Sequence, residues 1–88
     1  MSQRPITIYT TPWCPYCQRA KALLVEKKLV FNEIDVEEAP ELRQEMMLRS
    51  NRYTVPQIFI GARHIGGCDD LIALDRSGEL DRLTQGDA

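Results

Sequence analysis

The chain has 88 residues, of which 43% are hydrophobic and 27% are charged. This length is enough for one domain, and we expect residues 1–88 to form a single one. The composition is typical of a folded globular protein rather than a disordered one. A net charge of −2 without a basic cluster argues against nucleic-acid binding, and no apolar run approaches the ~20 residues of a membrane span, so no membrane partner is expected.

Two features point to the cytoplasm. Residues 1–5 lack the apolar core of a secretory signal. Three cysteines are an odd number for a secreted domain stabilised by disulfides. In a cytoplasmic protein, where thiols are kept reduced, a close pair of cysteines is typical of catalysis or metal binding.

The first predicted elements are a strand and a helix. Residues 6–10 are rich in β-branched and aromatic side chains, which predicts a strand. Pro12 pushes Thr11 out of the helical region, so a loop follows. Pro15 suits the first turn of a helix, where its missing N–H is not needed, and apolar residues recur at helical spacing as far as Leu24.

Two more strands and a second helix follow. Residues 31–36 alternate between apolar and polar side chains, which predicts a strand. Acidic residues around Pro40 mark the start of a helix that ends near Ser50. Residues 55–60 predict a third strand, and the two-residue link after it predicts an antiparallel hairpin with residues 63–65.

The last predicted helix opens at Asp69 and stops at Gly78. A final helical turn containing Leu80 and Leu83 is expected to cover the core, and residues 85–88 to form a frayed tail. The order strand–helix–strand–helix–strand–strand–helix predicts an α/β fold, with a four-stranded mixed sheet and helices on both faces.

Cys14 and Cys17 stand at the expected start of the first helix, with two residues between them. Free N–H groups and the positive end of the helix dipole stabilise an anion there, so Cys14 is expected to be a thiolate nucleophile. Cys17 lies one turn further in and suits a resolving thiol. Near a strand–helix–strand pattern, this spacing is a good signal of redox chemistry.

Two other interpretations of the cysteines remain. The first is an inert structural pair, but such a pair would not need a helix that starts with a proline beside it. A zinc site with three cysteines and one histidine has the right number of ligands, although the chain has no second Cys-x-x-Cys pair, so we expect no metal site. The residues for that alternative are Cys14, Cys17, His64 and Cys68.

Three motifs together resemble those of dithiol glutaredoxins, and more narrowly the bacterial glutaredoxin-3 type. The resemblance runs from about Pro5 to Leu83 and implies a thioredoxin fold and glutathione-dependent reduction of disulfides. It implies no tightly bound cofactor, with glutathione as a cosubstrate. The motifs are Tyr9-Thr10 leading into Cys14-Pro15-Tyr16-Cys17, then Thr54-Val55-Pro56-Gln57-Ile58-Phe59-Ile60, then Gly66-Gly67-Cys68-Asp69-Asp70-Leu71.

The resemblance also implies a glutathione site. The backbone of Val55, with Thr54 beside it, is expected to pair with the cysteinyl part of glutathione, and the Val55–Pro56 bond is expected to be cis. In the turn that starts at Gly67, the N–H groups of Cys68 and Asp69 are expected to hold the γ-glutamyl carboxylate.

Two aspartates follow this turn. The Asp69 carboxylate is expected both to pair with the γ-glutamyl ammonium group and to cap the helix, and Asp70 only to complement the helix dipole. Cys68 is expected to be a small, semi-buried residue whose backbone matters more than its sulfur.

Other side chains near the thiols have two interpretations each. Tyr16 flanks glutathione or has no role, and Arg52 grips the glycyl carboxylate or is simply solvated. Trp13 shields Cys14 and touches partner proteins, or packs in the core. Many family members carry a lysine where this chain has Thr11, so one electrostatic aid to the thiolate and to glutathione binding is missing.

Two rival functions are a redoxin reduced by thioredoxin reductase and a glutathione-ligated iron–sulfur or metal carrier. The turn at Gly66 and Gly67 argues against the first. Pro15 argues against the second, since the carriers of this family usually have glycine or serine there. The protein substrate stays open among ribonucleotide reductase, other reductases and glutathionylated proteins, and a monomer is the expected state.

Overall fold

The computed structural model describes residues 3–85, so most of the expected C-terminal tail lies outside the described residues. Its elements follow the predicted order, and the last part of the chain forms two helices, which correspond to the predicted last helix and the predicted final helical turn. Gly78, with a φ of +84°, separates them, because a backbone with positive φ cannot continue a right-handed helix. The elements are β1 (Ile6–Thr10), α1 (Pro15–Glu26), β2 (Asn32–Asp35), α2 (Pro40–Ser50), β3 (Gln57–Ile60), β4 (Arg63–Gly66), α3 (Cys68–Arg76) and α4 (Glu79–Thr84).

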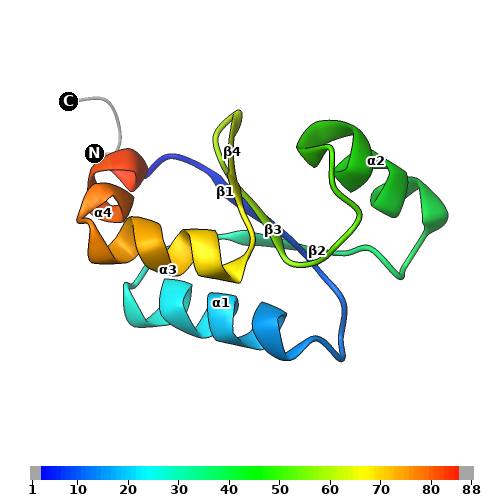
Figure 1. Ribbon diagram of the computed structural model, residues 1–88, viewed down its shortest axis with the longest axis horizontal. Coiled ribbons are helices and arrows are strands. Elements are labelled where there is room, and N and C mark those ends of the chain that lie inside the picture. The colour runs from blue at the N-terminus through cyan, green and yellow to red at the C-terminus, as the bar shows by residue number, and fades with distance from the viewer. Residues whose placement is uncertain (1–2, 86–88) are drawn as a thin grey trace.

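The four strands form one mixed sheet in the order β2-β1-β3-β4 (Figure 1). β1 runs parallel to β2 and antiparallel to β3, and β3 pairs with β4 in the predicted antiparallel hairpin. Gly61 has a φ of +59° in the turn between β3 and β4, a conformation that glycine adopts readily. The α/β architecture and the mixed sheet are therefore confirmed.

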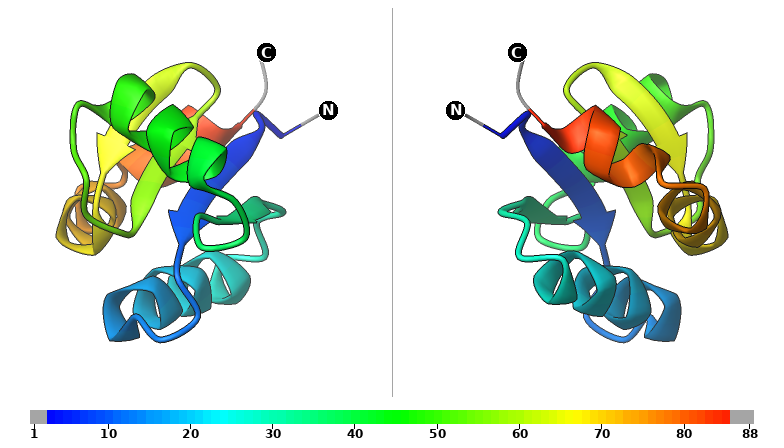
Figure 2. Two further views of the ribbon diagram at one scale, coloured as in Figure 1. Left: turned by 90° about the vertical axis from the view of Figure 1, so that its right-hand side faces the viewer. Right: turned by 90° about the vertical axis from the view of Figure 1, so that its left-hand side faces the viewer.

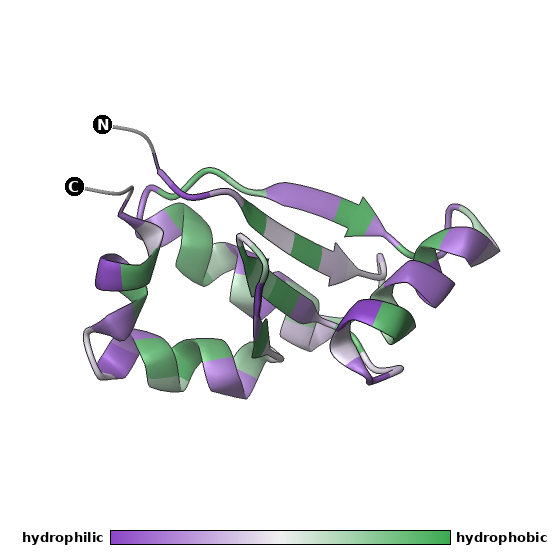
Figure 3. Ribbon diagram, turned by 90° about the horizontal axis from the view of Figure 1, so that it is seen from above, coloured by the Kyte–Doolittle hydropathy of each residue, from purple (hydrophilic) through white to green (hydrophobic). Residues whose placement is uncertain are grey.

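Helices cover both faces of this sheet: α1 and α3 lie on one side and α2 on the other (Figure 2). Successive strand residues point to opposite faces, and along β1 strongly hydrophobic residues alternate with less hydrophobic ones (Figure 3). The α1 and α3 face holds a cluster of Ile6, Ile8, Ala20, Leu24, Ile58, Ile60, Cys68, Leu71 and Leu80. The α2 face holds a smaller cluster of Tyr9, Val36, Met46 and Phe59.

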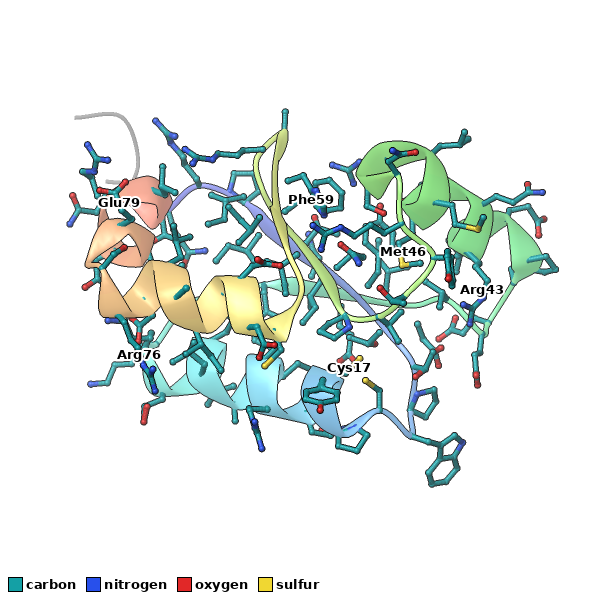
Figure 4. All side chains as sticks on the ribbon, in the orientation of Figure 1. Cys17, Arg43, Met46, Phe59, Arg76 and Glu79 are labelled. Carbon is teal, nitrogen blue, oxygen red and sulfur yellow. The ribbon has the colours of Figure 1, made fainter. Side chains whose placement is uncertain are left out.

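The small cluster is extended by polar contacts, because α2 carries mainly hydrophilic residues (Figure 3). Met46 is its buried apolar anchor, and Figure 4 shows it facing the sheet near Phe59. The guanidinium carbon of Arg49 lies 4.1 Å from the centre of the Phe59 ring. The hydroxyl of Tyr9 accepts a hydrogen bond from Arg49 and donates one to Glu45.

The sheet topology brings three loops to one end of the molecule. β1 ends where β3 begins, since the two strands are antiparallel, and β4 ends at the same place. The loop after β1, the segment before β3 and the turn after β4 are therefore neighbours. They carry residues 11–14, 54–56 and 66–67 respectively. Each of these segments contains part of one of the three motifs that stand far apart in the sequence.

Several boundaries differ from the predicted ones by one or two residues: β2 is shorter than the expected 31–36, β4 is one residue longer than the expected 63–65, and two further shifts lie at the site. β3 begins at Gln57 rather than at residue 55, because proline has no N–H for the ladder and Pro56 directly precedes the strand. α3 begins at Cys68, one residue earlier than predicted. Within residues 3–85, the helices are too short and too polar to cross a bilayer.

Candidate active site

Cys14 caps the N-terminus of α1. Its backbone is extended, with φ −94° and ψ 112°, and its half-buried Sγ accepts a hydrogen bond of 3.1 Å from the N–H of Cys17. Pro15 is the first helical residue, as predicted. The N–H groups of a helix start are aimed at this sulfur, and such a setting favours a negative charge on it. The position of Cys14 therefore fits the predicted nucleophile.

Cys17 has a different environment. It is fully buried, and Figure 4 shows its side chain at the start of α1, facing the sheet. Burial, together with the hydrogen bond to Cys14, raises the pKa of the Cys17 thiol to about 12. A backbone hydrogen bond from Thr11 and the charge of Lys21 oppose this rise but do not cancel it. Cys17 is therefore a protonated thiol at neutral pH.

A groove of about 240 Å³ opens at the end of the sheet near Cys14. All eight residues expected to bind glutathione line it, although they come from α1, from the segment before β3 and from the start of α3. Gln57 and Asp70 line it as well, and the sequence analysis did not assign them to it. The eight expected residues are Tyr16, Arg52, Thr54, Val55, Pro56, Gly67, Cys68 and Asp69.

Val55 connects the groove to the nucleophile. The thiol of Cys14 lies 3.7 Å from the backbone oxygen of Val55, within hydrogen-bonding distance for sulfur. The Val55–Pro56 peptide bond is cis, as predicted. A group held along the Val55 backbone would therefore lie next to the Cys14 sulfur.

In the turn between β4 and α3, the roles of the two aspartates differ from the expected ones. Asp70, not Asp69, caps the helix: its Oδ2 accepts a hydrogen bond of 2.9 Å from the N–H of Gly67. The reason is the earlier start of α3, which makes Asp70 the third helical residue, from which a side chain can reach back to the cap. Asp69 is exposed on the groove wall. Its carboxylate is therefore in position to meet a ligand there.

Asp70 also contacts Arg52, whose Nη1 lies 3.5 Å from the same Oδ2. Both side chains are half exposed, so the pair contributes little to stability by itself. It orients the guanidinium at the groove, however. Arg52 is therefore not simply a solvated side chain.

The aromatic residues beside the thiols are exposed. Trp13 is 86% exposed, so the interpretation that it packs in the core is wrong. Tyr16 is 55% exposed on the groove wall, and the guanidinium carbon of Arg19 lies 5.9 Å from its ring centre. Exposed aromatic rings next to a nucleophile are available to a partner molecule.

The residues of the zinc alternative do not meet. His64 lies on the α2 face, where its ring stacks on Phe59, whereas Cys68 belongs to the core on the opposite face. Among residues 3–85, no three His, Cys, Asp or Glu side chains are placed to share a metal ion. Cys68 is only 4% exposed, so it is more deeply buried than the semi-buried residue that was expected, and burial raises the pKa of its thiol.

Comparison with known proteins decides the family. The glutaredoxin family model matches residues 6–65, most of the described chain. The chain belongs to the glutaredoxin family. Its fold is accordingly the thioredoxin fold, and its function is that of a thiol–disulfide oxidoreductase, as predicted.

Individual relatives agree with this assignment. Glutaredoxin 3 of Escherichia coli K12 is 58% identical over 78 residues, which cover 89% of this chain and 94% of the relative. The solution structure of a glutaredoxin from Brucella melitensis superposes with a TM-score of 0.84 at 60% identity, covering 96% of this chain and 91% of that one. A buckwheat glutaredoxin–glutathione complex superposes with a TM-score of 0.84 at 27% identity, covering 92% of this chain and 76% of that one.

Sequence reasoning missed two groove residues, and each had a signal. Gln57 is a polar residue at the start of an otherwise apolar strand, where it is 1% exposed, and a buried polar side chain needs a partner. Asp70 stands three residues after Gly67, the spacing of a side chain that caps a helix. Both signals depend on where an element begins, and the sequence left that uncertain by one or two residues.

Proposed function

We propose that the protein uses glutathione to reduce protein–glutathione mixed disulfides and protein disulfides. The observation that carries this proposal is the position of the Cys14 sulfur, 3.7 Å from the Val55 backbone oxygen in the wall of the groove. The glutathione complex of the buckwheat relative supports it, because the two chains share the fold.

In the groove, each glutathione group has a suitable partner. The backbone of Val55 would pair with the cysteinyl residue and bring its sulfur to Cys14. The first N–H groups of α3, at Cys68 and Asp69, would receive the γ-glutamyl carboxylate, and the Asp69 carboxylate its ammonium group. Arg52, oriented by Asp70, would bind the glycyl carboxylate.

Deglutathionylation needs only Cys14. Its thiolate attacks the glutathione sulfur of the mixed disulfide, the old S–S bond breaks, and the protein thiolate leaves and takes up a proton. Cys14 is then bonded to glutathione. The thiolate of a second glutathione attacks the sulfur of the first, forming oxidised glutathione and returning Cys14 to the thiolate.

Reduction of a protein disulfide needs both cysteines. Cys14 attacks one sulfur and forms a mixed disulfide with the substrate, and Cys17 then loses its proton and attacks Cys14, releasing the reduced substrate. Charge on Cys14 is one cause of the raised pKa of Cys17, and that charge disappears once Cys14 is in a disulfide. The resolving thiol therefore becomes more acidic when it is needed. Two glutathione molecules then restore the dithiol.

The test is an assay that couples a small glutathione mixed disulfide to glutathione, glutathione reductase and NADPH. We expect Cys14→Ser to lose all activity. We expect Cys17→Ser to keep deglutathionylation and to lose the reduction of a protein disulfide. Activity of Cys14→Ser on the mixed disulfide would overturn the proposal.

The same preparation tests the rival functions. Faster reduction by thioredoxin reductase than by glutathione would favour the first rival. Colour and bound iron after anaerobic purification would favour the second.

We also propose that residues 1–88 act as one monomeric domain in the cytoplasm, on glutathionylated proteins, ribonucleotide reductase or other reductases. A reducing compartment suits a pair of thiols that must return to the reduced state in each cycle.

A further inference from the structure

We infer that the buried Gln57 and the partly buried His64 form a positioning pair that holds the Thr54–Val55 backbone in place for glutathione. Neither side chain takes part in the chemistry proposed above. The inference rests on the proposed function, because it concerns how the groove is kept ready for that ligand. It follows from one continuous chain of contacts between the α2 face of the core and the groove.

Gln57 is the central link. It is 1% exposed, and its Nε2 donates hydrogen bonds to the backbone oxygen of Thr54 at 3.0 Å and to Thr54 Oγ1 at 3.3 Å. A backbone oxygen can only accept, so the amide nitrogen must face Thr54 and the amide oxygen must face the other way. That oxygen lies 2.7 Å from His64 Nε2. His64 must therefore carry a proton on Nε2 and donate it to Gln57.

His64 is in turn fixed by the core. Its ring centre lies 5.0 Å from that of Phe59, and Phe59 also contacts Tyr9 edge-on and the guanidinium of Arg49. A register shift between β3 and β4 at Phe59 places His64 opposite that residue. Bulges of this kind commonly re-aim a side chain near a functional site. Contacts thus run from the core through His64 and Gln57 to Thr54.

The segment at the end of this chain needs such support. Thr54 and Val55 precede β3, so no ladder of the sheet holds them. Gln57 ties the Thr54 backbone down, and the next residue is Val55, whose oxygen lies beside Cys14. Breaking the pair would leave either the buried Gln57 amide or the partly buried His64 ring without its partner and would loosen this segment. The loss would fall on glutathione binding rather than on the reactivity of the sulfur.

Three substitutions separate these effects. Gln57→Leu removes both sets of hydrogen bonds, and His64→Phe keeps a ring to stack on Phe59 but removes the donor. His64→Gln carries an amide N–H at about the place of Nε2. We expect the first two to raise the KM for the glutathione mixed disulfide about five- to tenfold with kcat within about twofold of the wild type, since one buried hydrogen bond contributes about 1 kcal/mol. We expect His64→Gln to restore most of the wild-type KM.

Two readouts exclude a general loss of structure. The rate of iodoacetamide alkylation at Cys14 should stay unchanged in all three variants. Thr84→Val is the matched control, because Thr84 is a buried polar residue whose Oγ1 donates to the Leu80 oxygen at 2.8 Å and α4 does not line the groove. It should lower stability and leave the KM unchanged.

Two results would overturn the inference. One is an unchanged KM in Gln57→Leu while the wild type saturates normally with the mixed disulfide. The other is a KM for His64→Gln as high as that for His64→Phe. If the wild type itself shows no dependence on glutathione, the proposed function fails, and this inference fails with it.

Discussion

At the scale of single residues, position makes two identical side chains chemically different. Cys14 caps α1, is half exposed and accepts an N–H, whereas Cys17 is one turn further along and buried. Water and helix N–H groups stabilise the anion at the first sulfur, and burial destabilises it at the second. The same hydrogen bond joins the two residues, so the nucleophile and the resolving thiol form one unit.

This difference predicts selective alkylation. At about pH 7.5, iodoacetamide should modify Cys14 rapidly and the other two cysteines slowly, because burial raises the pKa of Cys17 and of Cys68 and keeps both as thiols. Mass spectrometry of the native protein should show one added group at early times. The chain unfolded in urea is the control and should show three, one for each cysteine. Equal rates for two native cysteines would contradict the assignment of separate roles.

At the scale of elements, proline and glycine explain which boundaries could be predicted. Pro15 and Pro40 each occupy the first helical position, where the fixed φ of proline suits a helix, and Gly78 ends α3, where glycine readily adopts a positive φ. The start of α3 has no such marker. Its shift by one residue, to Cys68, was enough to move the capping role from Asp69 to Asp70. Eight of the groove residues were therefore predictable, whereas Gln57, Asp70 and the hydrogen bonds of the turn were not.

Gly66 is the residue on which the turn before α3 depends. Its φ is +123°, and a Cβ there would lie 2.3 Å from Asp70 Oδ2, the atom that caps α3 and faces Arg52. Gly66→Ala should therefore displace the Asp70 carboxylate, lower the free energy of unfolding by about 2 to 3 kcal/mol and raise the KM for the glutathione mixed disulfide. Urea unfolding and the coupled assay measure the two effects.

Gly61→Ala is the matched control for this substitution. Gly61 also has a positive φ, of +59°, but a Cβ there would meet no atom within 4 Å. We expect it to cost about 1 kcal/mol, from backbone conformation alone, and to leave the KM unchanged. Equal losses of stability in the two variants would show that the contact with Asp70 does not matter.

At the scale of the whole molecule, one sheet has a different core on each of its faces and carries the site at one end. The apolar cluster under α1 and α3 follows the alternation of the strands, so the sequence predicted it well. The α2 side was less predictable. No periodicity in the sequence could show that the guanidinium of Arg49 packs on Phe59 and donates a hydrogen bond to the Tyr9 hydroxyl. Such contacts depend on which polar groups the fold brings together.

His64, on this polar side of the molecule, makes the stability of the folded protein depend on pH. It is the only histidine of the chain, and burial, with a smaller contribution from the charge of Arg52, lowers its pKa below the usual value. The folded protein therefore favours neutral His64, whereas the unfolded chain takes up a proton near pH ~6.5. Below that pH the unfolded state binds more protons than the folded one. The stability that neutral His64 contributes is fully present above about pH 6.5. It is lost as the pH falls through the pKa that His64 has in the folded protein.

The prediction is that acid destabilises the protein well before its carboxylates titrate. The urea midpoint should be lower at about pH 5.5 than at about pH 7.5, and His64→Gln should reduce the difference, since glutamine does not ionise. Glu33, whose pKa is lowered mainly by Lys21, loses its contribution only at lower pH, below ~4.5. An equal difference in the two proteins would mean that His64 is not the group that titrates, and the burial assigned to its ring would then be wrong.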